Sequence, residues 1–262
     1  GRTLRSPAGR PPPVAPLDLR RIAAPSLPAP HLAVVKLARL ASTAHDVLGY
    51  DAIMPVFCAH IESAALGLEI DWGEQASWPV AHSHPFDEPE MIQVPSDFLE
   101  RPSMRAALDA ISLLRRQYGD RVAIIGKVYG PWSLAYHLHG TENFLLETLL
   151  DPDKVRRYLD ALLPASLISG KAQIEAGADV ILWGDHATGD LVKSTMYREF
   201  LLPIHRHVTQ TLGAPIILHI CGDTADRLEY IVQAGFDGFH FDSKVDAREA
   251  MRIVGKRMSL VG

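Results

Sequence analysis

Cysteine is scarce in this chain, which has Cys58 and Cys221 as its two thiols among 262 residues. Two cysteines cannot build a disulfide framework, so a reducing, cytoplasmic setting is expected. No apolar run approaches the ~20 residues that a membrane span needs. The formal net charge is −5 and no polybasic block occurs. We therefore expect no nucleic-acid partner and no membrane surface.

Two local signals are also lacking. No glycine-rich phosphate fingerprint follows any apolar run, which makes a nucleotide-binding doubly wound sheet the weaker interpretation. No hairpin signal separates the expected strands. Proline is concentrated near the N-terminus, so residues 1–30 are predicted to be a partly extended Pro-rich segment, and residues 31–262 a single domain.

Strands and helices are expected to alternate along the rest of the chain. Strand followed by helix, repeated, indicates a parallel sheet with right-handed crossovers. The polar stretch 71–95 is long for a connection, so it is either a lid or a structured excursion. Clear strands are expected at 50–57, 122–128, 178–183, 215–218, 236–242 and 257–261, with a doubtful one at 14–24; helices are expected at 31–48, 62–67, 103–118, 132–139, 144–150, 153–176, 192–212 (broken by Pro203), 224–234 and 247–254.

Polar residues gather just after the ends of these strands. Active sites of parallel α/β folds lie at the carboxyl ends of the strands, on the loops that follow. The residues in this position are Cys58, His60, Tyr129, Asp185, His219, Cys221 and Asp242.

His219 and Cys221 form the sharpest candidate. They stand two residues apart at the end of an apolar strand, so their side chains project from the same face. An imidazole and a thiol in that position make half of a zinc site. The alternative is a buried histidine beside a small buried cysteine.

Four segments in a fixed order carry a family resemblance: Gly130–Leu134 (GPWSL), Ala176–Asp179 (AGAD) leading to 185–191, Phe200–Pro203 (FLLP), and His219–Gly222 (HICG). Together they resemble the uroporphyrinogen decarboxylase superfamily, and most closely its cobalamin-dependent methyltransferase branch. The resemblance implies a (β/α)8 TIM-type barrel. It also implies that this chain lacks the last strand and helix of that barrel.

Four details favour the methyltransferase branch over true decarboxylases. The Arg-rich N-terminal signature of the decarboxylases has no match, and Cys58 stands at or beside their pyrrole-binding Asp. Their tyrosine near the Gly-Pro-Trp segment has only an offset counterpart, Tyr136. His219-Ile220-Cys221 replaces their Lys-Gly-Gly type segment and looks like the start of the methyltransferases' zinc motif.

The resemblance implies zinc bound by His219 and Cys221, with a third ligand beyond Gly262. It also implies a corrinoid carried by a partner protein. A methyl group then moves between this corrinoid and a thiol, or from a methylated substrate to the corrinoid. The remaining assignments are catalytic roles for Asp185 and Glu62, and substrate binding by Cys58, Tyr129, Tyr136 and Asp242.

Other interpretations remain open. A tetrapyrrole decarboxylase is the alternative enzyme, and a remnant barrel that only docks a corrinoid protein is the non-catalytic one. Asp185 and Asp242 are also explained by capping or turn roles, and Glu62 as the first-turn acid of a helix. Among the other histidines, His240 shares the polar face of its strand with Asp242, which is the face of a pocket residue, whereas His137, His139, His205 and His207 are expected at the surface.

Overall fold

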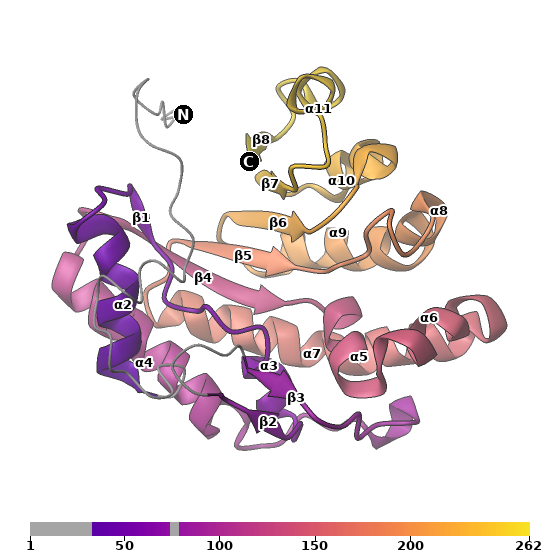
Figure 1. Cartoon of the computed structure of the whole chain (residues 1–262), viewed down its shortest axis with the longest axis horizontal. Coiled ribbons are helices and arrows are strands. Elements are labelled where there is room, and N and C mark those ends of the chain that lie inside the picture. The colour runs from indigo at the N-terminus through magenta and orange to yellow at the C-terminus, as the bar shows by residue number, and fades with distance from the viewer. Residues whose placement is uncertain (1–32, 74–78) are drawn as a thin grey trace.

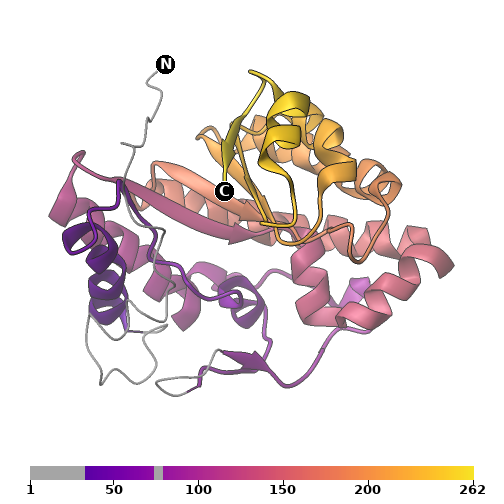
Figure 2. The same cartoon turned by 45° about the horizontal axis from the view of Figure 1, so that its top comes forward.

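The structure is a computed structural model that describes residues 33–73 and 79–262. Its centre is a parallel sheet, whose six strands in the described residues follow the order β1-β4-β5-β6-β7-β8. The sheet curls like part of a barrel (Figure 2), which confirms the expected fold class. The strands are β1 (Ala52–Ile53), β4 (Ala123–Tyr129), β5 (Val180–Gly184), β6 (Ile216–Ile220), β7 (Gly238–Phe241) and β8 (Ser259–Val261).

Helices cover the outside of the curled sheet. Figure 1 shows α7 running beneath β4 and β5, and α4 and α7 both pack against β4. At the other end of the sheet, α10 packs between α9 and α11. The longer helices are α2 (Val34–Asp46), α4 (Pro102–Tyr118), α5 (Pro131–His139), α6 (Thr141–Leu150), α7 (Pro152–Glu175), α9 (Leu202–Thr211), α10 (Leu228–Ala234) and α11 (Ala247–Val254); the short ones are α3 (Ile61–Ala65), α8 (Ser194–Met196) and η5 (Ala225–Arg227).

The first strand is much shorter than its apolar run predicts. The run spans residues 50–57, but β1 pairs with β4 only at Ala52 and Ile53. Pro55 has no backbone N–H to donate and cannot continue a ladder. The chain beyond β1 therefore leaves the sheet before it reaches Cys58.

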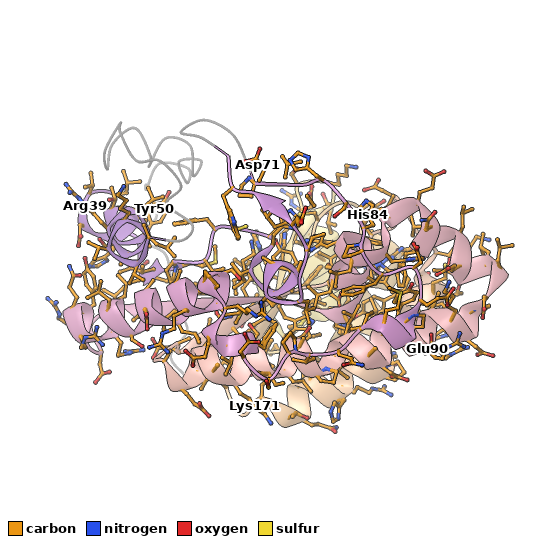
Figure 3. All side chains as sticks on the ribbon, turned by 90° about the horizontal axis from the view of Figure 1, so that it is seen from below. Arg39, Tyr50, Asp71, His84, Glu90 and Lys171 are labelled. Atoms are coloured by element: carbon orange, nitrogen blue, oxygen red, sulfur yellow. The ribbon has the colours of Figure 1, made fainter. Side chains whose placement is uncertain are left out.

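The polar stretch after α3 is a structured excursion. It contains an antiparallel pair, β2 (Ile70–Asp71) with β3 (Val80–Ala81), so the expectation of no hairpin was wrong. Two 3₁₀ turns follow, η2 (Pro89–Met91) and η3 (Phe98–Glu100). Figure 3 shows Asp71 near the middle of the molecule, with His84 and Glu90 further toward one end, so the excursion runs over one half of it.

The helix break expected at Pro203 takes an unusual form. A π-helical turn, η4 (Tyr197–Leu201), separates α8 from α9, and Pro203 lies in the first turn of α9. Pro203 has no backbone N–H, so the preceding turn lacks one α-helical hydrogen bond. This favours the wider hydrogen bonds of a π-helical turn. The turn brings Tyr197 and His205 to the same buried side.

The doubtful strand at 14–24 and the Pro-rich segment 1–30 lie outside the described residues. In the part of the chain that is described, no helix has the length and hydrophobicity for a membrane crossing.

Candidate active site

A pocket of about 580 Å³ lies at the carboxyl ends of the parallel strands. Its position agrees with the general placement of active sites in parallel α/β folds. Both His219 and Cys221 belong to its wall, as does His240. The described lining residues are Met54, Phe57, Ala59, His60, Pro79, Lys127, Tyr129, Leu182, His186, His219, Cys221 and His240.

The register of the sheet explains why these side chains meet. Tyr129 pairs with Gly184, Gly184 with His219, and His219 with His240. Residues that stand side by side on neighbouring strands point to the same face of the sheet. One row of the inward face therefore carries the tyrosine and both histidines, and Gly184 leaves room for the Tyr129 ring.

His219 is oriented through both of its ring nitrogens. Nδ1 lies 3.2 Å from the carbonyl oxygen of His240, and Nε2 lies 3.0 Å from the Sγ of Cys221. A proton on Nδ1 donated to the carbonyl leaves the Nε2 lone pair directed toward the thiol. Histidines that bind metals use this arrangement, with the second nitrogen donating to a carbonyl.

The loop after β6 is held by two carboxylates. Asp242 accepts from the backbone N–H of Gly222 at 2.9 Å, and Asp190 accepts from that of Asp223 at 3.1 Å. Hydrogen bonds from the Gly222 and Lys244 backbone lower the pKa of Asp242. Gly222 has φ +88°, and a Cβ there would come within 2.3 Å of Asp190 Oδ2. Only glycine fits directly after Cys221.

His186 brings a third candidate metal ligand from the loop after β5. Its backbone N–H donates to Ser133 Oγ at 2.9 Å, and its ring lies 5.5 Å from that of His219. One ligand atom each from His186, His219 and Cys221 lies within 4.8 Å of the others. We call these residues the His-His-Cys cluster.

The neutral histidines of the pocket suit metal binding, whereas the Cys221 thiol must lose its proton when a metal binds. Burial lowers the pKa of His219 to about 4, and it also lowers the pKa of His186 and of His240. These imidazoles are therefore neutral and keep a free lone pair at neutral pH. Burial and the nearby Asp242 raise the pKa of Cys221. Two nitrogens and one sulfur match the donor set of a zinc site that keeps a fourth position open.

Asp185 lies behind the pocket wall rather than in it. It is fully buried, accepts from the backbone N–H of Ser133 at 2.9 Å, and lies 3.0 Å from His205 Nε2. His205 Nδ1 in turn lies 2.8 Å from the hydroxyl of Tyr197. Ser133 also binds His186, so Asp185 helps to position the loop that carries the cluster.

Glu62 and Cys58 lie outside the described pocket lining. Glu62 is fully buried, and burial raises its pKa to about 7 although Ser169 Oγ donates to it at 2.8 Å. Among the described residues, the second oxygen of Glu62 has no hydrogen-bond partner. Cys58 is buried, which raises its pKa to about 11, and its Sγ accepts from the backbone N–H of His60. Its neighbour His60 reaches the pocket, but the thiol does not.

The two predicted tyrosines have different positions. Tyr129 lines the pocket, and its ring centre lies 5.8 Å from that of His186. Tyr136 is outside the described lining, and its hydroxyl accepts from Trp132 Nε1 at 2.6 Å. Asp242 acts on the site through the backbone of Gly222.

Several histidines expected at the surface are buried, and that expectation was wrong. His205 is fully buried, and His139 is 3% exposed and contacts Glu147 at 3.0 Å. His137 lies 2.9 Å from Ser63 Oγ, and burial lowers its pKa to about 3. Residues from the excursion and from α7 cover α5 from both sides, which helical spacing alone cannot reveal. His207 is exposed as expected.

Two polar residues of the pocket lining, His186 and Lys127, were not among the sequence candidates. His186 directly follows Asp185 at a strand end, so its place in the chain could have identified it. Lys127 lies inside the apolar run of β4, but it is two residues before Tyr129 and therefore shares its face. That alternation could have identified Lys127 as a pocket residue.

A curled parallel α/β sheet with a histidine-lined pocket at its carboxyl ends defines an enzyme-like barrel architecture. The chain belongs to the uroporphyrinogen decarboxylase family, because the profile described as Uroporphyrinogen decarboxylase (URO-D) matches residues 8–262. The chain is 34% identical over 257 residues to a methylated-thiol–coenzyme M methyltransferase of Methanosarcina mazei, covering 96% of this chain and 70% of that protein.

Other relatives belong to the same branch. Identity is 31% over 229 residues to the methylcobamide:CoM methyltransferase MtaA of Methanosarcina barkeri, covering 86% of this chain and 68% of that protein. A solved structure described as a methyltransferase from Methanosarcina mazei superposes with a TM-score of 0.89 at 30% identity, over 94% of this chain and 74% of that one. These similarities support the branch favoured by the sequence motifs.

Proposed function

We propose that this chain is a corrinoid-dependent methyltransferase whose His-His-Cys cluster holds zinc. The observation that carries the proposal is the convergence of His186, His219 and Cys221 in one pocket of a chain similar to methylcobamide:CoM methyltransferases. The methyl group moves between a corrinoid carried by a partner protein and a small thiol, or from a methylated substrate to that corrinoid. The corrinoid supplies the cobalt–methyl bond, which protein side chains cannot provide.

The chain's own residues bind and orient the small molecule. Zinc, when bound, supplies a Lewis acid that keeps a thiol deprotonated at neutral pH. The His240 carbonyl fixes the ring of His219, and Asp242 fixes the loop after Cys221. Tyr129 forms the pocket wall beside the cluster. Asp185 acts as a positioning residue, since its carboxylate is buried behind His186.

We propose that Glu62 acts indirectly, by supporting β4, the strand that carries Lys127 and Tyr129 into the pocket. Ser169 joins Glu62 to Gln173, and the side chain of Gln173 bonds both the N–H and the carbonyl of Lys127 at 2.9 and 2.8 Å. The carboxyl group therefore supports β4 through residues of α7. Cys58 and Tyr136 belong to the buried core of the chain.

Metal analysis combined with a methyl-transfer assay tests the proposal. Purified protein is expected to contain about one zinc per chain. It should demethylate methylcobalamin in the presence of a small thiol. His219→Ala and Cys221→Ser should lose both zinc and transfer, whereas His207→Ala, which removes an exposed imidazole on α9, should keep both.

Two results would overturn the proposal. One is a zinc content at background in protein purified without chelators and then offered zinc. The other is full transfer activity in Cys221→Ser. Formation of coproporphyrinogen from uroporphyrinogen in a parallel assay would instead support the decarboxylase alternative.

A further inference from the structure

Arg227 is a fully buried arginine at the end of η5, in the segment that follows Cys221. A guanidinium stays protonated in a folded protein, so burying one takes a full charge out of water. Such a group is tolerated only where its N–H donors are bonded. The neighbouring Asp226 meets part of this requirement, because its Oδ1 accepts from Nε at 2.8 Å. The remaining donors bind a different loop.

The terminal nitrogens of Arg227 bond the loop after β5, which carries His186. Nη1 donates to the carbonyl oxygen of Ala187, and Nη2 donates to that of Val192 at 2.7 Å. Between these two points the chain passes close to the guanidinium, since a Cβ on Gly189 would lie 3.2 Å from Nη2. The loop therefore arches around the guanidinium, which holds it at both ends.

Arg227 in this way joins the two loops that carry the His-His-Cys cluster. Its own segment continues from Cys221, whereas Nη1 bonds the residue directly after His186. A guanidinium is a planar fork that holds two carbonyl oxygens at a fixed separation, which a flexible ammonium does not. On the other side of His186, Asp185 and Ser133 fix the start of the same loop. His186 is therefore restrained from both directions.

We propose that Arg227 is a positioning residue that sets the separation of His186 from Cys221, and with it the geometry of the metal site. This inference rests on the proposed function, because it concerns the same cluster. Arg227 is fully buried and outside the described pocket lining, so it acts through the backbone of the loop and not by contact with metal or substrate.

Arg227→Lys tests this assignment first in the metal-free protein. Lysine keeps the charge, but one ammonium does not hold both carbonyl oxygens. The amide hydrogens of residues 187–192 should exchange with solvent at least about tenfold faster than in the wild type, because the loop opens more often. Those of β5 and α11 should exchange as before. Unchanged exchange in the loop would overturn the inference. Faster exchange throughout the chain would also overturn it, since that marks a general loss of stability.

The metal site provides the second measurement, which a residue that only fills the core would not change. Arg227→Lys should bind zinc at least about tenfold more weakly, at the lower end of the losses seen when an outer-shell partner is removed. The visible spectrum of bound Co²⁺ should shift in the same sense as in a variant that lacks one nitrogen ligand. Zinc affinity or a Co²⁺ spectrum equal to that of the wild type would overturn the inference.

Gly189→Ala disturbs the same contact from the side of the loop and leaves Arg227 intact. Gly189 is exposed, and the added methyl group would lie 2.8 Å from the carbonyl oxygen of Asp223 and 3.2 Å from Arg227 Nη2. The loop should move away from the guanidinium, with the same faster exchange and weaker zinc binding. This variant decides the question if Arg227→Lys fails to fold, and wild-type behaviour in it would then overturn the inference.

Arg206→Lys is the matched control. Arg206 is exposed, and its Nε also donates to a backbone carbonyl oxygen, that of Gln233 at 3.1 Å, but this bond joins α9 to α10. The variant should match the wild type in loop exchange, zinc affinity and Co²⁺ spectrum.

Hydrogen exchange without metal separates this inference from the proposed function. A wild-type chain that binds no zinc would sink the proposed function, and the exchange of residues 187–192 in Arg227→Lys would still show whether Arg227 holds the loop of His186. Zinc binding and methyl transfer by the wild type, with wild-type loop exchange in Arg227→Lys and Gly189→Ala, would keep the proposed function and overturn the role of Arg227.

Discussion

The Nδ1 of His219 lies 3.2 Å from the carbonyl oxygen of His240 on the neighbouring strand, and the two rings lie 4.6 Å apart. The carbonyl belongs to the backbone, so it orients His219 whatever side chain residue 240 carries. Orientation of the cluster is therefore a property of the β6–β7 register. The β4–β5 and β5–β6 registers place Tyr129 in line with both histidines, so pocket and sheet are built together.

The third cluster residue can be tested separately from the other two. His186→Ala should lower zinc affinity at least about a hundredfold, since loss of an outer-shell partner alone usually lowers affinity 10–100-fold. Competition with a chromophoric chelator measures this affinity, and Co²⁺ substitution reports the loss of one nitrogen ligand in the visible spectrum. His60→Ala is the control, because His60 lines the same pocket outside the cluster. Unchanged Co²⁺ spectra in His186→Ala would remove His186 from the site.

Gly222 and Gly213 form a matched pair of glycines for a test of the loop after β6. Both have positive φ, +88° and +70°, but a Cβ on Gly213 meets nothing within 4 Å, whereas one on Gly222 meets Asp190 and Thr188. Gly213→Ala should cost about 1–2 kcal/mol of unfolding free energy from backbone strain alone. Gly222→Ala should cost about 1–3 kcal/mol more, from overpacking, and should also weaken zinc binding.

Urea unfolding and metal titration of the two glycine variants give the result directly. Equal losses of stability would mean that the loop rearranges freely around the new methyl group. In that case the positions of Asp190 and Thr188 would not restrain Cys221.

The parts of the fold that sequence patterns predicted are those set by local periodicity. Helix α11 was expected at 247–254 and is found there, and β5, β6 and β7 agree within a few residues. Patterns failed where one residue interrupted a run, as Pro55 does after β1. They also failed where contacts from distant segments decided burial, as for His205, which looks like a surface residue of an amphipathic helix until β5 places Asp185 against it.

The candidate site was predictable in part for the same reason. Side chains alternate between the two faces of a strand, so His219 and Cys221, which stand two residues apart, can be placed on one face from a single segment of sequence. His186 comes from a different loop, and its approach to Cys221 depends on the β5–β6 register and on the Ser133 hydroxyl. No pattern within a single segment contains that information.

The buried carboxyl group of Glu62 predicts a pH-dependent stability. Its pKa is raised from 4.5 to about 7 by burial, so the folded chain holds the proton more tightly than the unfolded chain. The unfolded chain releases that proton first as pH rises, and stability therefore falls between pH ~4.5 and ~7 and then levels off. The full effect is about 3 kcal/mol.

Glu62→Gln removes this ionisation and keeps an oxygen for Ser169 Oγ. Urea unfolding at several pH values should show the variant gaining stability relative to wild type as pH rises through this window. Parallel curves for the two proteins would show that the carboxyl group already ionises at its ordinary pKa in the folded chain.

The Tyr197–His205–Asp185 network should behave as one unit. All three side chains are fully buried, and Asp185 is the one charged member that needs a partner. Asp185→Asn should lower the free energy of unfolding by about 3–5 kcal/mol, the usual loss of stability when one member of a buried pair is changed. Tyr197→Phe removes a single hydrogen bond, so it should cost about 1 kcal/mol.

A double-mutant cycle distinguishes a coupled network from two independent contacts. His205 lies between the two changed residues. If it couples them, the loss of unfolding free energy in the Asp185→Asn/Tyr197→Phe double variant should be at least about 0.5 kcal/mol smaller than the sum of the two single losses. Asp185→Asn should also weaken zinc binding, because the Ser133 backbone that it holds carries the hydroxyl bound by His186. Tyr197→Phe should leave zinc affinity nearly unchanged, since it lies at the far end of the network. Additive stability losses with equal zinc affinities would mean that Asp185 only fills the core and does not position the cluster.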